Sequence, residues 1–111
     1  MVGLAETIEN NKLIAEFMEI NTSIPHDRQH IYLYDISWDW LMPVVEKIES
    51  LPLINDAGIC VLIEHSYCRI YLDNWGEYTT VAENATKKNK LSAVYLSVIE
   101  FIKWYNQNKE L

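Results

Sequence analysis

The sequence predicts a single α+β domain, a helix–sheet–helix sandwich with element order α-β-α-β-β-α and a small mixed sheet. Three observations predict it. Apolar residues recur at helical spacing in three segments, and apolar and polar residues alternate over 67–72. The 111 residues are enough for one hydrophobic core but too few for two, so residues 1–111 are expected to form one domain.

The first helix is expected at about residues 5–20, where Ile14, Phe17 and Met18 recur at i, i+3 and i+4. Polar residues occupy the other positions of this segment, which is typical of a helix with one face against a core. After a loop, the β-branched and aromatic run Ile31–Tyr34 predicts a short strand.

A second helix is expected to begin after Ser37, which is a suitable N-cap, with Asp39 in the first turn where the helix dipole favours a carboxylate. Pro43 lies too deep for a first helical position, so a kink or a tight opening turn is expected. The helix is expected to end near Ser50. Its buried face would consist of Leu41, Val45 and Ile48.

Two further strands are predicted at Ile59–Ile63 and Tyr67–Leu72, joined around His65-Ser66 as a hairpin. A right-handed βαβ unit would consist of the strand at Ile31–Tyr34, the second helix and the strand at 59–63. Such a unit would make the sheet mixed.

Residues 73–88 are expected to form a long connection, in which Tyr78–Val81 could add a short edge strand. A final helix is expected at about residues 90–107, capped by Asn89 and packed on the apolar face of the hairpin. Its apolar stripe comprises Leu91, Val94, Tyr95, Val98, Ile102 and Tyr105.

The two cysteines are expected to be free thiols. If His65-Ser66 is a two-residue turn, Ile63 pairs with Cys68, and Cys60 then points to the opposite face of the sheet. No secretory signal is expected from the N-terminal residues, and no apolar run approaches the roughly 20 residues of a membrane span. A reducing cytoplasm is therefore the expected compartment.

The net charge of −7 is unevenly distributed. Residues 1–86 contain 14 acidic and 4 basic side chains, giving −10, whereas residues 87–111 contain 2 acidic side chains and 5 lysines, giving +3. An acidic body disfavours direct binding of nucleic acid, because phosphates need cationic partners. It is compatible with a protein partner that has a basic surface, and equally with a solvated surface that serves solubility alone.

Four segments together resemble the small, uncharacterised bacteriophage and prophage proteins described as phage ABA-sandwich domains. They are Asn11–Met18, Asp35–Ile48, Ala93–Tyr95 and Glu100–Asn106. The resemblance implies a helix–sheet–helix sandwich, an origin in a mobile element and residence in the cytoplasm of a bacterial host. It implies no activity, because the family has none assigned.

Candidate metal ligands and catalytic residues have little support in the remaining sequence. His26 and His30 have a spacing that suits metal ligands in a helix, but they lie in a stretch expected to be a loop, and no third ligand is fixed by spacing. Cys60 or Cys68 could act with His65 as a nucleophilic pair, but no Gly-rich elbow or oxyanion element accompanies them. No catalytic residue, metal ligand or cofactor is therefore predicted.

Aromatic residues are the remaining candidates for function. Trp38 or Trp40 and Trp104 are expected to pack in the core, whereas Trp75 belongs to no helical or strand stripe. The predicted partner-binding residues are Asp73, Trp75, Glu77 and Tyr78.

The sequence thus predicts a non-enzymatic protein that binds a macromolecular partner, and inhibition of a bacterial defence system such as a CRISPR effector is one function of this kind. Two alternatives remain open. One is a metal- or small-molecule-binding accessory protein that uses His26 and His30, and the other is a structural homo-oligomer of a phage.

Overall fold

The computed structural model describes residues 3–19, 32–53 and 57–108. Three helices and three strands follow one another as α-α-β-β-β-α, and the predicted α+β class is confirmed. The elements are α1 (Leu4–Phe17), α2 (Trp38–Ser50), β1 (Gly58–Glu64), β2 (Tyr67–Asn74), β3 (Glu77–Ala85) and α3 (Lys90–Asn108).

The sheet is antiparallel throughout, with strand order β1-β2-β3. The predicted hairpin is confirmed, because Glu64 pairs with Tyr67 across the turn His65-Ser66 and Ile63 pairs with Cys68. The pairing of β2 with β3 shifts by one position between Ile70 and Tyr71.

The prediction of a strand at Ile31–Tyr34 is wrong for residues 32–34, which the structure describes. Residues 32–37 form a turn in which the Leu33 carbonyl accepts hydrogen bonds from the amides of Ile36 and Ser37, at 3.2 and 2.9 Å. Both Tyr32 and Tyr34 are buried by this turn. The apolar character of the run therefore reflects burial of an irregular segment, and Ile31 itself lies outside the described residues.

The third strand is instead β3, which extends over nine residues where only a short edge strand at Tyr78–Val81 was predicted. The predicted βαβ unit is consequently absent from the described chain, and the sheet is not mixed. β3 was hard to recognise because most of its residues are exposed and carry no apolar alternation.

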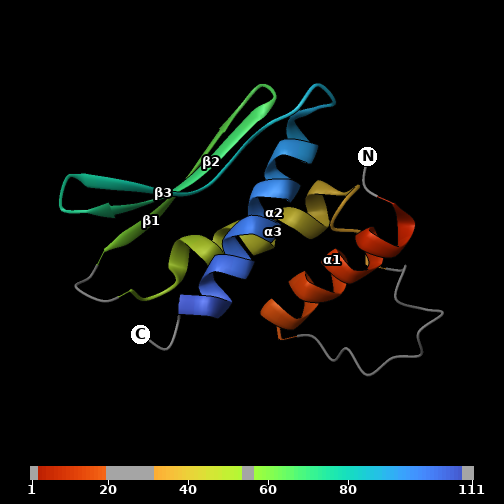
Figure 1. The fold of residues 1–111 in the computed structure, drawn as a ribbon, viewed down its shortest axis with the longest axis horizontal. Helices are drawn as coiled ribbons and strands as arrows, with labels where there is room; N and C mark the ends of the chain where they lie inside the picture. Colours follow the sequence, from red (N-terminus) through yellow and green to blue (C-terminus); the bar gives the residue numbers. More distant parts are fainter. Residues whose placement is uncertain (1–2, 20–31, 54–56, 109–111) are drawn as a thin grey trace.

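The helices all lie on one side of the sheet (Figure 1). α3 packs against β2, as predicted, but its other main contact is with β3, and it touches the predicted β1 much less. α2 packs against β1, and α1 packs against α3. The layers therefore run sheet, α2 with α3, then α1, and not helix, sheet, helix. The far end of the β2–β3 hairpin extends past the helices, at the left of Figure 1.

The observed helix ends lie close to the predicted positions. Asn89 caps α3, since its Oδ1 accepts a hydrogen bond of 2.8 Å from the Ser92 amide. α2 begins after Ser37 with a tight turn, in which the Trp40 amide donates to the Ser37 carbonyl at 3.2 Å, and the helix continues through Pro43. α1 ends at Phe17, earlier than the predicted residue 20.

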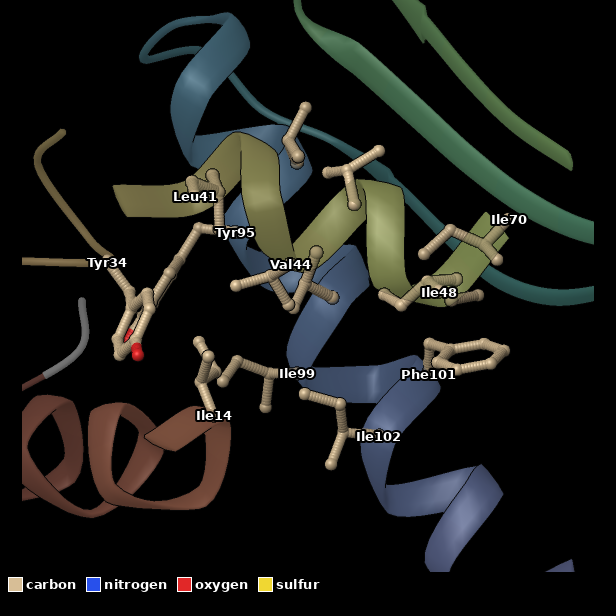
Figure 2. Packing of buried hydrophobic residues seen from close by; sticks show 14 of the residues in the cluster. Ile14, Tyr34, Leu41, Val44, Ile48, Ile70, Tyr95, Ile99, Phe101 and Ile102 are labelled. Carbon is tan, nitrogen blue, oxygen red and sulfur yellow. The ribbon is translucent and has the colours of Figure 1, made fainter. Parts of the chain in front are cut away.

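The core lies between α2, α3 and the inner face of the sheet (Figure 2). Side chains of Leu41, Val44 and Ile48 on α2 point toward α3, and Ile14 of α1 approaches Ile99 from the other side. Further fully buried core residues include Ile70, Cys68, Val94, Val98, Phe101 and Ile102.

A buried polar network joins α1 to the rest of the core. The Asn11 side-chain amide donates to the Tyr32 carbonyl and to Asp35 Oδ1, both at 3.0 Å, and Asn11 Oδ1 accepts a 2.9 Å hydrogen bond from the Tyr95 hydroxyl. Asn11 is 2% exposed. Because an unsatisfied buried polar group is costly, the three partners make this asparagine difficult to replace.

We expect Asn11→Ala to lower the free energy of unfolding by about 2–3 kcal/mol, because it leaves buried partners unsatisfied. Tyr95→Phe, which removes one bond of the network, should cost about 1 kcal/mol. Urea denaturation followed by circular dichroism measures both values. Asn106→Ala, on the exposed face of α3, is the matched control, and an equal effect there would contradict the role of the network.

Candidate interaction surface

The outer face of the sheet carries a row of aromatic and polar side chains, and none of the three described helices lies over it. Side chains alternate along β2, so Cys68 and Ile70 are fully buried against the helices while Tyr67, Arg69 and Tyr71 point the other way and are half-buried. We call this outer surface the open face. It comprises Cys60, Leu62, Tyr67, Arg69, Tyr71, Tyr78, Thr80 and Glu83.

Cross-strand contacts hold these side chains in place. Arg69 Nε donates to Thr80 Oγ1 at 2.7 Å, and the guanidinium lies 4.8 Å from the centre of the Tyr71 ring. The rings of Tyr71 and Tyr78 meet edge to face, with centroids 5.6 Å apart. The open face is thus a structured surface whose side chains have defined positions before any partner binds.

Two phenols on the open face stay protonated at neutral pH. The Tyr67 hydroxyl donates to Glu83, and this hydrogen bond is the main cause that raises the pKa of Tyr67. A hydrogen bond with Cys60 similarly raises the pKa of Tyr71. Both tyrosines therefore present neutral hydroxyl groups.

The β2–β3 turn has an unusual residue at its tip. Asn74 pairs with Glu77, which leaves Trp75-Gly76 as a two-residue loop, and both loop residues have positive φ angles, 57° and 97°. Two positive φ angles are what a type I′ hairpin turn requires, and Asn-Gly is the preferred sequence for it. A tryptophan in the left-handed region is strained, and yet the Trp75 side chain is 82% exposed.

The four predicted partner-binding residues all lie at this end of the hairpin. Asp73 is the next-to-last residue of β2 and pairs directly with Tyr78 on β3. Trp75 lies in the turn, and Glu77 begins β3. Tyr78 is 61% exposed. The structure therefore brings these four residues to one place.

The neighbouring residues of the open face were not predicted as part of the site. Arg69 and Tyr71 continue the surface from the turn along β2. Their alternation with Cys68, Ile70 and Leu72 was visible in the sequence, and it assigned them to the face away from the core. The alternation did not reveal that α1, α2 and α3 all lie on the other side of the sheet.

The other predicted aromatic positions are structural. Trp40 packs edge to face on Tyr34, with ring centroids 5.2 Å apart, and Trp104 lies 5.7 Å from the ring of Phe101. Both are partly buried against the core, as predicted, whereas Trp38 remains 36% exposed.

The two thiols lie on opposite faces of the sheet and are free, as predicted. Cys68 is fully buried, and burial raises its pKa from 9.0 to about 11. A thiol with so high a pKa is a poor nucleophile at neutral pH, and the proposed partner His65 is exposed in the β1–β2 turn. Cys60, on the open face, forms a side-chain hydrogen bond with Tyr71.

His26 and His30 lie outside the described residues, so the structure does not bear on their use as metal ligands. Within residues 3–19, 32–53 and 57–108, no three His, Cys, Asp or Glu side chains cluster in a way that could hold a metal ion. None of the described helices is long and apolar enough to cross a membrane.

Comparison with known proteins gives no match: no protein-family model, no curated protein and no solved structure is significantly similar to this chain.

We expect Trp75→Asn to raise the free energy of unfolding by up to about 1 kcal/mol, because asparagine tolerates the left-handed region better than other non-glycine residues. Thermal unfolding measures the change. Trp75→Ala removes the same exposed ring without relieving the strain and is the control. If asparagine and alanine give equal stabilities, the backbone at Trp75 is not strained.

The pKa of Cys68 predicts a loss of stability at high pH. Below pH 9 the Cys68 thiol is protonated in both the folded and the unfolded protein. Between pH 9 and 11 the unfolded protein loses this proton first, so the free energy of unfolding falls by about 2–3 kcal/mol. Cys68→Ala should lack this contribution, whereas Cys60→Ala should retain it. Urea titrations at several pH values would contradict the assignment if all three proteins showed the same decline.

Proposed function

We propose that this protein acts by binding a protein partner through the tip of the β2–β3 hairpin and the adjoining open face. The observation that carries the proposal is Trp75, a large aromatic side chain that is 82% exposed on a strained turn. A residue that costs stability and contributes little to the core needs another reason to be there, and strained backbone is found preferentially at functional sites.

The chemistry of the surface supports binding. Exposed tryptophan and tyrosine side chains are the residues that most often dominate the energy of protein interfaces. The aromatic tip is flanked by the carboxylates of Asp73 and Glu77, and residues 1–86 carry a net charge of −10. Such a surface suits a partner with a basic patch, because complementary charges speed association and orient the encounter.

We further propose that binding, and not turnover, is the activity. The buried Cys68 thiol, with its raised pKa, is poorly suited to nucleophilic chemistry. The resemblance to phage ABA-sandwich domains suggests a setting in an infected bacterium, where an acidic protein could occupy a basic surface that a defence complex uses for nucleic acid. Inhibition of such a system, CRISPR effectors included, is the function that we propose within that setting.

The test is affinity capture from a bacterial host lysate with the immobilised protein, followed by mass spectrometry and direct binding measurements on the captured partner. Trp75→Ala should weaken binding by at least about tenfold, because it removes an aromatic anchor. Binding should also weaken as salt rises from about 0.05 M to about 0.5 M, since screening acts on exposed charges.

Trp38→Ala provides the matched control, because Trp38 is a partly exposed tryptophan of α2 that lies away from the hairpin. It should bind as the parent protein does. A partner that binds Trp75→Ala and the parent protein equally well would show that the hairpin tip is not the interface. Capture of no partner at all, together with a co-purifying metal or metabolite, would overturn the proposal of a binding protein.

A further inference from the structure

A hollow lies beside the hairpin tip, between the turn and the start of β1. It measures about 270 Å³ and is lined by Gly58, Cys60, Asp73, Trp75 and Gly76. Gly58 is the strand partner of Asp73 in the sheet, and a Cβ atom at Gly58 would meet no other atom within 4 Å. The absence of a side chain at Gly58 therefore leaves the space next to Asp73 open on the β1 side.

The carboxylate in this hollow is held in position. Asp73 Oδ1 accepts a hydrogen bond of 3.0 Å from the backbone amide of Gly76, inside the turn. A carboxylate has about four acceptor positions, so this bond fixes the group and leaves capacity for further donors. Its strand partner on β3 is Tyr78, whose ring is braced by Tyr71.

The indole of Trp75 and the oriented carboxylate of Asp73 together make the hollow a favourable site for a cation. A cation over an indole face gains electrostatic attraction from the ring, and a neighbouring carboxylate adds to it. The nearest cation of the open face, Arg69, is already engaged with Thr80 and Tyr71, so it does not neutralise Asp73 through either of these contacts.

We infer that this hollow receives an arginine side chain of the partner protein, with its guanidinium stacked on Trp75 and donating to Asp73. This inference rests on the proposed function and names the chemistry of its contact. The reason for arginine is geometric: a planar guanidinium can lie flat on an indole and donate hydrogen bonds from its edge at the same time. A lysine ammonium is a compact, strongly hydrated charge that cannot do both as well.

The test is an NMR titration of the full-length, ¹⁵N-labelled protein with a blocked glycine–arginine–glycine peptide. The indole N–H signal of Trp75, identified by its loss in Trp75→Ala, should shift in a saturable way. Asp73→Asn should weaken this binding about fivefold while keeping the acceptor for the Gly76 amide. Glu49→Gln, which removes the same charge from an exposed position on α2, should change it less than about twofold.

Three results would overturn the inference: no saturable shift, equal binding by Asp73→Asn and the parent protein, or equal binding of the corresponding lysine peptide. These results are distinct from failure of the proposed function. If the captured partner loses affinity for Trp75→Ala but not for Asp73→Asn, the hairpin tip is an interface and the arginine contact is wrong. If neither substitution affects the partner, the interface itself lies elsewhere.

Discussion

The burial of α3 is the constraint on which the rest of the structure depends. Eight residues of this helix are buried, and they cover several of its sides: Ala93, Val94, Tyr95, Ser97, Val98, Ile99, Phe101 and Ile102. A helix that is apolar over so much of its surface must be enclosed. The inner face of the sheet covers it on one side, and α2 and α1 cover it on others. Since the three described helices gather around this contact, none of them covers the outer face of the sheet.

Buried polar groups fix how the elements meet in this arrangement. Asn11 joins α1 to the turn before α2 and to Tyr95 of α3. Ser97 of α3 donates to the Cys68 carbonyl at 3.2 Å and accepts from Asn84 Nδ2 at 3.0 Å, which ties the helix to β2 and β3. Apolar packing alone would tolerate a rotated or shifted helix, whereas each of these bonds is satisfied in one register only.

The hairpin tip is free of these constraints. Residues 74–80 are exposed, and this end of the hairpin extends beyond the helices, so burial in the core does not set their identities (Figure 1). At such a position the local geometry of the turn would favour Asn-Gly, and the chain has Trp-Gly. The proposed contact with a protein partner would account for a tryptophan at this position.

The sequence by itself determined the elements with strong local patterns. The final helix and its Asn89 cap, the second helix after Ser37, and the register of the β1–β2 hairpin all follow from periodicity and turn length. It also picked out Trp75, because that residue fits no apolar stripe. These features depend on neighbouring residues in the chain, which is why a linear pattern contains them.

Only the tertiary structure decided how the elements combine. Tyr32 and Tyr34 look like strand residues, but both are buried by a turn that α1 and α2 enclose, so the mixed sheet and its βαβ unit do not form. β3 forms because it pairs with the edge of β2, and its own pattern of apolar and polar residues does not predict a strand. The open face likewise depends on where the described helices pack, and the hollow beside Asp73 depends on the pairing of Asp73 with Gly58, so residues distant in sequence decide both.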